Sequence, residues 1–400
     1  MELYIHIPFC RQKCRYCDFA SWSGQESLMG AYVDALLLEA EAMVPNAKSA
    51  PIETVFIGGG TPSILPAPLL TRLLHGLRQH YSIPEGVEFT SEANPGTLTE
   101  PWLEAALSGG VNRLSMGMQA AQPDLLRTLG RIHTQQDVAD SVRLAREMGV
   151  RNLSLDLMFG LPGQTPEMWR ASIDAALSLS PEHMSCYGLI TENGTPLKRD
   201  LDAGRLTLPD EEAERQMYDD TLSILAAQGY QQYEISNFAK PGRECRHNIG
   251  YWTRVPYIGL GASAASFLQT ASGGLRLTNP ARIRDYIAIA QEKAWRRRER
   301  TSLLPEDARF ESLMLGLRMT RGLSEADFEG MHGMTLDAYC GDVLRQQEQR
   351  GLLVHQDGHW ALTRRGMDAE RHPGRDHGIS GIMKRTGRLR NRRSVRFCIT

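Results

Sequence analysis

The chain has 400 residues, of which 42% are apolar, and its 45 Lys and Arg against 47 Asp and Glu leave a net charge of −2. This length and composition support one large core and a smaller second one, which excludes fibrous and wholly disordered proteins. No apolar run reaches the ~20 residues of a membrane-spanning helix, and the start Met1–Tyr4 lacks the basic and apolar regions of a signal peptide. We therefore expect a cytoplasmic protein.

Three cysteines follow the first predicted strand. Leu3–Ile7 is short and apolar, it is ended by Pro8, and Cys10, Cys14 and Cys17 come soon after it. Thiolates are the usual protein ligands of iron–sulfur clusters, and this spacing suits a loop around one cubic 4Fe-4S cluster. Three ligands would leave one iron open to a small molecule. The alternative, a zinc site, normally needs a fourth Cys or His nearby.

The first 190 residues predict a parallel sheet. Short apolar strands alternate with amphipathic helices, which is the pattern of consecutive β/α units. An open, six-stranded partial β/α barrel is the simplest fold that fits this pattern. The predicted strands are Leu3–Ile7, Thr54–Ile57, Glu88–Ser91, Arg113–Gly117, Asn152–Leu155 and His183–Tyr187, with helices near Leu28–Met43 and after Pro66, Thr99, Thr134 and Thr165.

Polar or glycine-rich residues stand where these strands end. Gly58–Gly60 follows the second strand, Glu92 the third, Gln119 the fourth and Asp156 the fifth. Catalytic groups of β/α barrels lie at the carboxyl ends of the strands, so we expect these residues to share one face with the cysteines. The glycines would let the backbone approach a ligand closely. They match neither a dinucleotide-binding fingerprint nor a phosphate loop.

Taken together, the motifs resemble the radical S-adenosylmethionine (SAM) superfamily. A narrower likeness, to the oxygen-independent coproporphyrinogen III oxidase group, covers residues 3–365 and includes Gly58–Pro62, Gly117–Gln119, Gly130–His133 and Asp156–Gly163. The resemblance implies a radical SAM barrel that carries a 4Fe-4S cluster and binds SAM at its open iron. It also implies a SAM pocket lined by Tyr4, Tyr16, Gly60, Thr61, Glu92, Gln119, Arg131 and Asp156.

Two features depart from the oxidase pattern. Phe19 stands where the oxidase has a fourth cysteine, and only nine residues precede Cys10. In both respects the chain is similar to the shorter HemW-like heme chaperones, which share the barrel but lack that activity. The resemblance implies heme, a heme-acceptor protein such as a respiratory cytochrome, and an electron donor as partners. The oxidase remains the alternative function.

The motif His247–Trp252 follows the barrel in a stretch punctuated by Pro and Gly, which predicts a loop. An imidazole can bind heme iron axially, and Tyr251 and Trp252 offer flat apolar surface to a macrocycle. His247 is therefore our candidate heme ligand, with Cys245 as a weaker alternative.

The chain divides into four predicted regions: a barrel (1–235), a connecting region (236–300), a smaller, mainly helical domain (301–367) and a tail (368–400). Helices at Leu303–Met319, Leu323–His332 and Leu336–Gly351, followed by a hairpin at 352–363, resemble a winged helix. Acidic residues on the third helix argue against DNA binding, so no nucleic-acid partner is expected. Residues 371–400 hold nine Lys/Arg and one acid, which favours a solvated, disordered extension. Peripheral membrane contact and dimerisation are left open.

Overall fold

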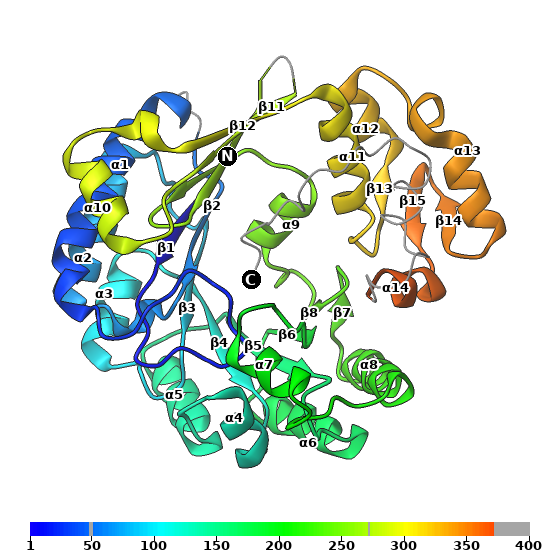
Figure 1. The fold of residues 1–400 in the computed structure, drawn as a ribbon, viewed down its shortest axis with the longest axis horizontal. Coiled ribbons are helices and arrows are strands. Elements are labelled where there is room, and N and C mark those ends of the chain that lie inside the picture. Colours follow the sequence, from blue (N-terminus) through cyan, green and yellow to red (C-terminus); the bar gives the residue numbers. More distant parts are fainter. Residues whose placement is uncertain (48–50, 271–272, 372–400) are drawn as a thin grey trace.

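The computed structural model describes residues 1–47, 51–270 and 273–371. Six parallel strands lie side by side in chain order and curve around a common interior, with helices on the outside (Figure 1). The predicted open β/α barrel is thereby confirmed. The six strands are β1 (Glu2–Ile7), β2 (Thr54–Gly59), β3 (Glu88–Ala93), β4 (Arg113–Gln119), β5 (Leu153–Phe159) and β6 (His183–Gly188).

Threonine side chains begin several of the outer helices. Thr99, Thr134 and Thr165 each accept a hydrogen bond from the backbone N–H three residues further on, which satisfies a donor that the first helical turn leaves free. These three predicted starts are confirmed. The helices that connect the strands are α1 (Met29–Ala47), α2 (Ala67–His80), α3 (Glu100–Ser108), α4 (Pro123–Leu129), α5 (Gln135–Glu147) and α6 (Pro166–Ser178).

The two faces of the barrel strands differ in chemistry because successive side chains point to opposite sides. On β1, Leu3 and Ile5 belong to the main apolar core formed with the outer helices. Tyr4, between them, packs inward against Phe56 of β2, with ring centroids 6.3 Å apart. The inner face is mostly polar on β3, β4 and β5, where Glu92, Ser115 and Asp156 alternate with core residues, and it is therefore the face that can bind a polar ligand.

The sheet continues beyond the six parallel strands at both edges. Next to β1 lie β9 (Tyr257–Leu260), β10 (Ala265–Leu268), β11 (Gly274–Thr278) and β12 (Glu299–Leu303), and next to β6 lie β8 (Asn237–Ala239) and β7 (Gln231–Gln232). Residues 236–300, expected to connect two domains, thus supply strands to the main sheet. This pairing gives hydrogen-bond partners to the backbone N–H and C=O groups that would be unpaired if β1 and β6 were edge strands.

A buried carboxylate fixes this extension to the barrel. Glu39 of α1 accepts hydrogen bonds from the Gly261 N–H at 2.8 Å, the Asn279 amide at 2.8 Å and the Tyr286 hydroxyl at 2.6 Å. Arg298 adds an ion pair at 3.3 Å. Because every partner belongs to the segment after β9, this one side chain anchors that whole segment, including α10 (Ile283–Gln291), against α1.

The C-terminal domain has an apolar core of its own around Phe328, Leu336 and Trp360. It joins the barrel through Arg318, which lies 3.6 Å from Glu234 and stacks over the ring of Trp252 at 4.4 Å. The expected helices and hairpin are confirmed, whereas the basic tail lies outside the described residues. The elements are α11 (Pro305–Gly316), α12 (Glu325–His332), α13 (Leu336–Gln349) and α14 (Arg364–Arg371), with a sheet of β13 (Leu323–Ser324), β15 (His359–Leu362) and β14 (Leu353–Gln356).

Among the residues that the structure describes, no helix combines the length and the apolar character needed to cross a bilayer.

Candidate functional site

The cysteine loop lies at the carboxyl end of β1 and is tied to the barrel at both ends. The Cys10 N–H donates to the carbonyl of Trp22 at 2.9 Å, and the Trp22 N–H donates to that of Pro8 at 2.8 Å. Further along, the Arg15 N–H donates to the carbonyl of Leu129, the last residue of α4, at 2.9 Å. The backbone of the loop is thus fixed before any ligand binds.

The three thiols lie close enough together for their charges to interact. Burial, and then the charges of Cys14 and Cys10, raise the pKa of the Cys17 thiol to about 11. Burial likewise raises the pKa of Cys10, with Cys14 adding to the effect. Within the described ranges, no three Cys, His, Asp or Glu side chains are drawn together tightly enough to hold a metal ion. Three thiol sulfurs on one anchored loop nevertheless form a donor set that fits an iron–sulfur cluster. Binding of the cluster would draw the three sulfurs together.

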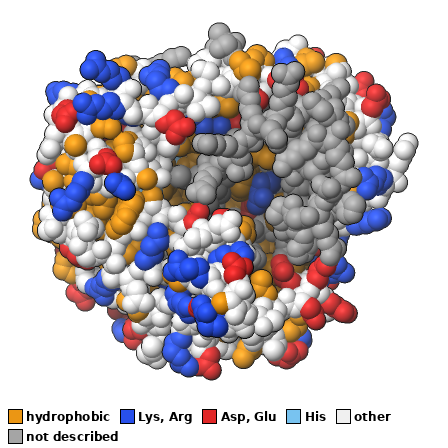
Figure 2. All heavy atoms as spheres, in the orientation of Figure 1, with side chains coloured by type: hydrophobic (Ala, Val, Ile, Leu, Met, Phe, Trp, Pro, Cys, Tyr) orange, Lys and Arg blue, Asp and Glu red, His pale blue; other side chains and the backbone are white. Residues whose placement is uncertain are grey.

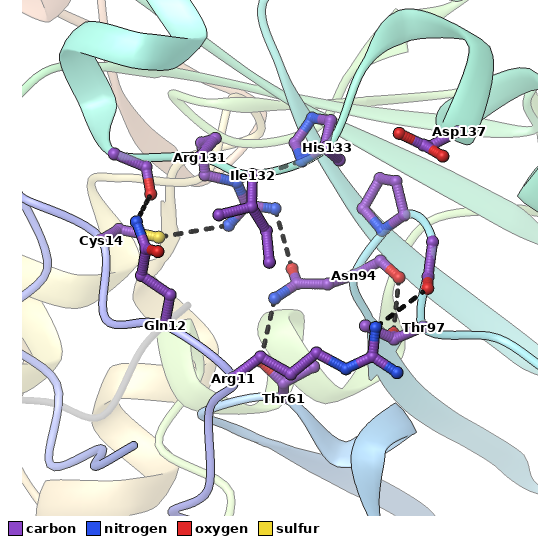
Figure 3. A pocket seen from close by; sticks show the side chains of 13 residues that line it. Arg11, Gln12, Cys14, Thr61, Asn94, Thr97, Arg131, Ile132, His133 and Asp137 are labelled. Atoms are coloured by element: carbon purple, nitrogen blue, oxygen red, sulfur yellow. Dashed lines mark hydrogen bonds between the residues drawn. The ribbon is translucent and has the colours of Figure 1, made fainter. Parts of the chain in front are cut away.

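Hydrogen-bond donors approach two of these sulfurs. Arg131 Nη1 lies 3.4 Å from Cys14 Sγ, and Thr61 Oγ1 lies 3.6 Å from Cys10 Sγ. Arg131 also donates to the carbonyl of Gly117 at 2.8 Å. These side chains border a cavity of about 230 Å³, into which Ile132 points (Figure 3). A cation beside thiolates, at the mouth of a cavity, suits a site for an anionic group of a ligand.

Two half-buried carboxylates lie inside the barrel, close enough for their charges to repel each other. Glu92 Oε2 accepts a hydrogen bond from the Gly59 N–H at 3.0 Å, and Ser115 Oγ donates to both carboxylate oxygens of Asp156, at 3.1 and 3.2 Å. Burial, and then repulsion by Asp156, raise the pKa of Glu92 to about 8. Burial also raises the pKa of Asp156. Such a pair gains stability from a ligand that supplies hydroxyl donors or positive charge.

Three glycines, the last two residues of β2 and the one that follows it, are required by close packing. A Cβ at Gly58 would lie 2.9 Å from Glu92 Oε1, one at Gly59 would lie 2.4 Å from the His6 ring, and one at Gly60 would lie 2.6 Å from the carbonyl oxygen of Phe9. Gly59 also has a φ of +111°, which disfavours any side chain. The triplet lets β2 pass the cysteine loop and the ring of His6 at contact distance.

Gly59→Ala is expected to destabilise the fold by about 3 kcal/mol or more, because overpacking and a strained backbone add together. Urea unfolding measures the change. Gly86→Ala is the matched control, since Gly86 has a φ of +78° but nothing within 4 Å of an added Cβ. It is expected to cost about 1 kcal/mol. Equal losses in the two variants would contradict a steric role for the His6 ring.

The predicted heme ligand lies at the other end of the barrel. His247 is 1% exposed and lies in a helix, α9 (Arg246–Trp252), rather than in the loop that the sequence predicted. The helix forms because Glu88 accepts hydrogen bonds from its first N–H groups, at 2.8 Å from Arg246 and 3.0 Å from His247. Glu88 and Thr54 begin β3 and β2, so α9 closes the amino end of the barrel.

Both ring nitrogens of His247 have partners in this conformation. Nδ1 lies 2.7 Å from Thr54 Oγ1, and Nε2 lies 3.2 Å from the Tyr251 hydroxyl. Burial, and then the nearby Arg113, lower the pKa of His247 to about 3, so the ring is neutral. The strand residues around His247 are the first residues of β1, β2 and β3, namely Glu2, Thr54 and Glu88. The cysteines, in contrast, follow the last residue of β1. The two predicted sites are therefore separated by a strand of about 20 Å.

Comparison with known proteins assigns the chain to a family. Residues 4–176 match the radical SAM superfamily model, and residues 303–368 match the HemN C-terminal domain. The heme chaperone HemW of Bacillus subtilis (strain 168) is 40% identical over 91% of this chain and 95% of its own length. The chain belongs to the HemW family of radical SAM proteins. The Escherichia coli (strain K12) HemW is 36% identical over 92% of the chain and 95% of its own length.

The fold of this HemW family member is shared with a known enzyme. Coproporphyrinogen III oxidase (HemN) from Escherichia coli matches it with a TM-score of 0.78, covering 92% of this chain and 88% of that one. At 23% sequence identity this likeness concerns the fold alone. Because the match covers 92% of this chain, it supports the fold of both the barrel and the C-terminal domain.

The structure places the predicted SAM residues of this HemW family member in two neighbouring groups. Around the cysteine loop, Gln119 ends β4 with its amide over Gly117, beside Arg131. Tyr16 lies between two of the cysteines, where burial raises the pKa of its hydroxyl. Deeper in the barrel, the Tyr4 hydroxyl bonds to His6 Nδ1 at 2.9 Å, on the same inner face as Glu92 and Asp156. The ligand roles of all these residues remain predictions. The first group is Tyr16, Gly60, Thr61, Gln119 and Arg131, and the second is Tyr4, Glu92 and Asp156.

Sequence analysis missed two residues of the site. Asn94 joins Thr61 to Arg131, and its only signal was its position two residues after Glu92 at the end of a strand. His6 belongs to the predicted strand Leu3–Ile7, and nothing in the sequence indicates a role for it in the site. Its ring lies between the Tyr4 hydroxyl and the carbonyl of Ala20, and burial lowers its pKa to about 4.

Proposed function

We propose that the protein is a heme chaperone, which binds heme and transfers it to an acceptor protein in the cytoplasm. The observation that carries this proposal is the likeness to proteins named heme chaperone HemW along nearly the whole of both chains. Phe19, where the oxidase pattern has a fourth cysteine, also favours it. Respiratory cytochromes are the class of acceptor that the family resemblance suggests.

The cysteine loop and the inner face of the barrel define the second part of the proposal. Cys10, Cys14 and Cys17 would hold a 4Fe-4S cluster, which supplies an electron and an open iron for SAM when it is bound. Arg131 would pair with the SAM carboxylate, because a guanidinium forms charge-assisted hydrogen bonds with carboxylates. Glu92 and Asp156 would accept hydrogen bonds from the ribose hydroxyls. An electron donor completes the set of proposed partners.

Heme ligation by His247 would require its ring to give up a present partner. Nε2 is the nitrogen that would be released more readily, since its contact with the Tyr251 hydroxyl is the longer of the two at 3.2 Å and a rotation of the Tyr251 side chain would break it. Thr54 is fixed in β2 and can retain Nδ1 at 2.7 Å, which would orient the ring and make it a better ligand. Because His247 is 1% exposed, the residues that cover it would also have to move before iron could reach Nε2.

Heme titration of the purified full chain tests this proposal. His247→Ala is expected to weaken heme binding at least tenfold and to change the visible spectrum, because the axial ligand is lost. Tyr251→Phe is expected to retain or strengthen binding, since it frees Nε2. His332→Ala, in the C-terminal domain, serves as the control for removing an imidazole elsewhere. Wild-type protein that fails to bind heme would contradict the chaperone, and undiminished binding by His247→Ala would contradict the assigned ligand.

The rival function is oxygen-independent coproporphyrinogen III oxidase, favoured by the shared fold. Reconstituted protein given coproporphyrinogen III, SAM and a reductant without oxygen is expected to form no decarboxylated porphyrinogen. Formation of that product, and its loss in a variant lacking the three cysteines, would establish the oxidase instead.

Nucleic acid is not among the proposed partners. On α13, the helix that a winged-helix protein would place in the DNA groove, Arg345 is paired with Asp342 at 2.8 Å and also contacts Asp337. Paired in this way, the helix offers little free positive charge to phosphate groups.

A further inference from the structure

Asn94 lies just after β3 and connects two side chains that contact cysteine sulfurs. Its Nδ2 donates to Thr61 Oγ1 at 2.8 Å, and its Oδ1 accepts from Arg131 Nη2 at 2.8 Å. Thr61 in turn approaches Cys10 Sγ at 3.6 Å, and Arg131 approaches Cys14 Sγ at 3.4 Å. Figure 3 shows the amide between Thr61 and Arg131. One side chain thus links the donors to two of the three predicted cluster ligands.

The donors and acceptors in this chain of contacts have only one consistent arrangement. A guanidinium has donors and no acceptor, so the Asn94 carbonyl oxygen must face Arg131 and the NH₂ group must face Thr61. The NH₂ group is also only a donor, so the Thr61 oxygen accepts from it. The hydroxyl proton of Thr61 is then free to point at Cys10 Sγ. Asn94 therefore sets the direction of the hydrogen bond that reaches this sulfur.

The backbone of Asn94 is held in place from both sides. Its N–H donates to Ser63 Oγ at 3.2 Å, and its carbonyl accepts from the Thr97 hydroxyl at 2.6 Å and the Thr97 N–H at 3.1 Å. Pro95 follows and restricts the conformation of Asn94 itself. The amide is therefore preorganised before a ligand binds.

We propose that Asn94 is a positioning residue for the cluster, which holds the Thr61 hydroxyl and the Arg131 guanidinium as hydrogen-bond donors to the sulfurs of Cys10 and Cys14. The inference rests on the 4Fe-4S cluster of the proposed function. Donors to cluster sulfurs stabilise the reduced form, which carries more negative charge, and so raise the reduction potential.

The midpoint potential of the reconstituted cluster tests the proposal, in an anaerobic reductive titration followed by electron paramagnetic resonance. Asn94→Leu is expected to shift the midpoint to a more negative potential at unchanged iron and sulfide content. Asn94→Asp is expected to shift it further in the same direction, because a carboxylate adds negative charge and turns the Thr61 hydroxyl away from Cys10. Its oxygen still accepts from Arg131, so SAM affinity should fall in Asn94→Leu but stay near the wild-type value in Asn94→Asp.

Gln12→Leu is the matched control. Gln12 borders the same cavity, but its amide donates to the carbonyl of Gly130 at 3.1 Å, so its removal should leave the midpoint potential unchanged. If the Asn94 variants do not load a cluster, Thr61→Val tests the same link and is also expected to shift the midpoint to a more negative potential.

Loaded Asn94→Leu and Thr61→Val proteins with the wild-type midpoint would overturn the proposal, as would an equal shift in Gln12→Leu. A wild-type chain that binds no iron would contradict the cluster, and the role of Asn94 with it. Heme binding is measured separately, and its failure would contradict the chaperone while leaving the role of Asn94 intact.

Discussion

Replacing Cys10, Cys14 and Cys17 together by alanine is expected to reduce bound iron and sulfide from about four of each per chain to background. Thr61 and Arg131, which approach two of the sulfurs, are hydrogen-bond donors and would not replace a thiolate as an iron ligand. Iron and sulfide analysis after anaerobic reconstitution measures the loss, together with the visible absorption of thiolate-bound iron.

Cys340→Ala is the control for the cysteine variants. Cys340 is buried in the core of the C-terminal domain, away from the barrel, and its removal should leave the iron content unchanged. Full iron and sulfide in the triple variant would show that the cluster, if present, is held elsewhere.

Glu92→Ala and Asp156→Ala are each expected to weaken SAM binding by about ten- to one-hundred-fold. At pH 9, where Glu92 is mostly ionised, each substitution removes a charge-assisted hydrogen bond worth ~1.5–3 kcal/mol, and each 1.4 kcal/mol corresponds to a factor of ten in affinity. Calorimetry on the reconstituted protein measures the change. Glu182→Ala is a suitable control, because that carboxylate pairs with Arg146 at 2.9 Å outside the inner face. Unchanged affinity in both inner-face variants would mean that SAM binds elsewhere.

The raised pKa of Glu92 predicts how SAM binding depends on pH. With a pKa of about 8, raised by burial and then by Asp156, Glu92 is mostly protonated at pH 7 and ionised at pH 9. Only the ionised form offers two acceptor oxygens and a negative charge, so affinity should rise with pH through this range, by up to about tenfold. Glu92→Gln removes the titrating group and should flatten this rise.

The sequence was sufficient to predict the parts of the molecule that depend on local pattern. Strand alternation, threonine caps and the order of motifs along the chain led to the barrel and to the positions of the cysteines, Glu92 and Asp156. These features depend on neighbours in the sequence, and the carboxyl ends of parallel strands necessarily meet on one face.

Features that depend on distant partners escaped prediction. The helix around His247 forms because Glu88, at the start of β3, caps it, and no pattern near His247 reveals that partner. Asn94 acquires its role only when Thr61 and Arg131 are brought to it from other strand ends. The strands on the outer edges of the sheet were missed because β9, β10 and β11 are short and their pairing is set by the free edge of β1.

The alternating faces of the barrel strands separate two kinds of evolutionary change. Leu155 and Leu157 help to keep the protein folded, while Asp156 between them faces the interior and contributes little to the apolar core. A substitution at an inner position can therefore alter ligand preference at small cost to folding. One scaffold can in this way diverge into proteins of different chemistry through single, separately tolerated steps, and protein engineers can vary its inner positions as a combinatorial set while leaving the outer ones untouched.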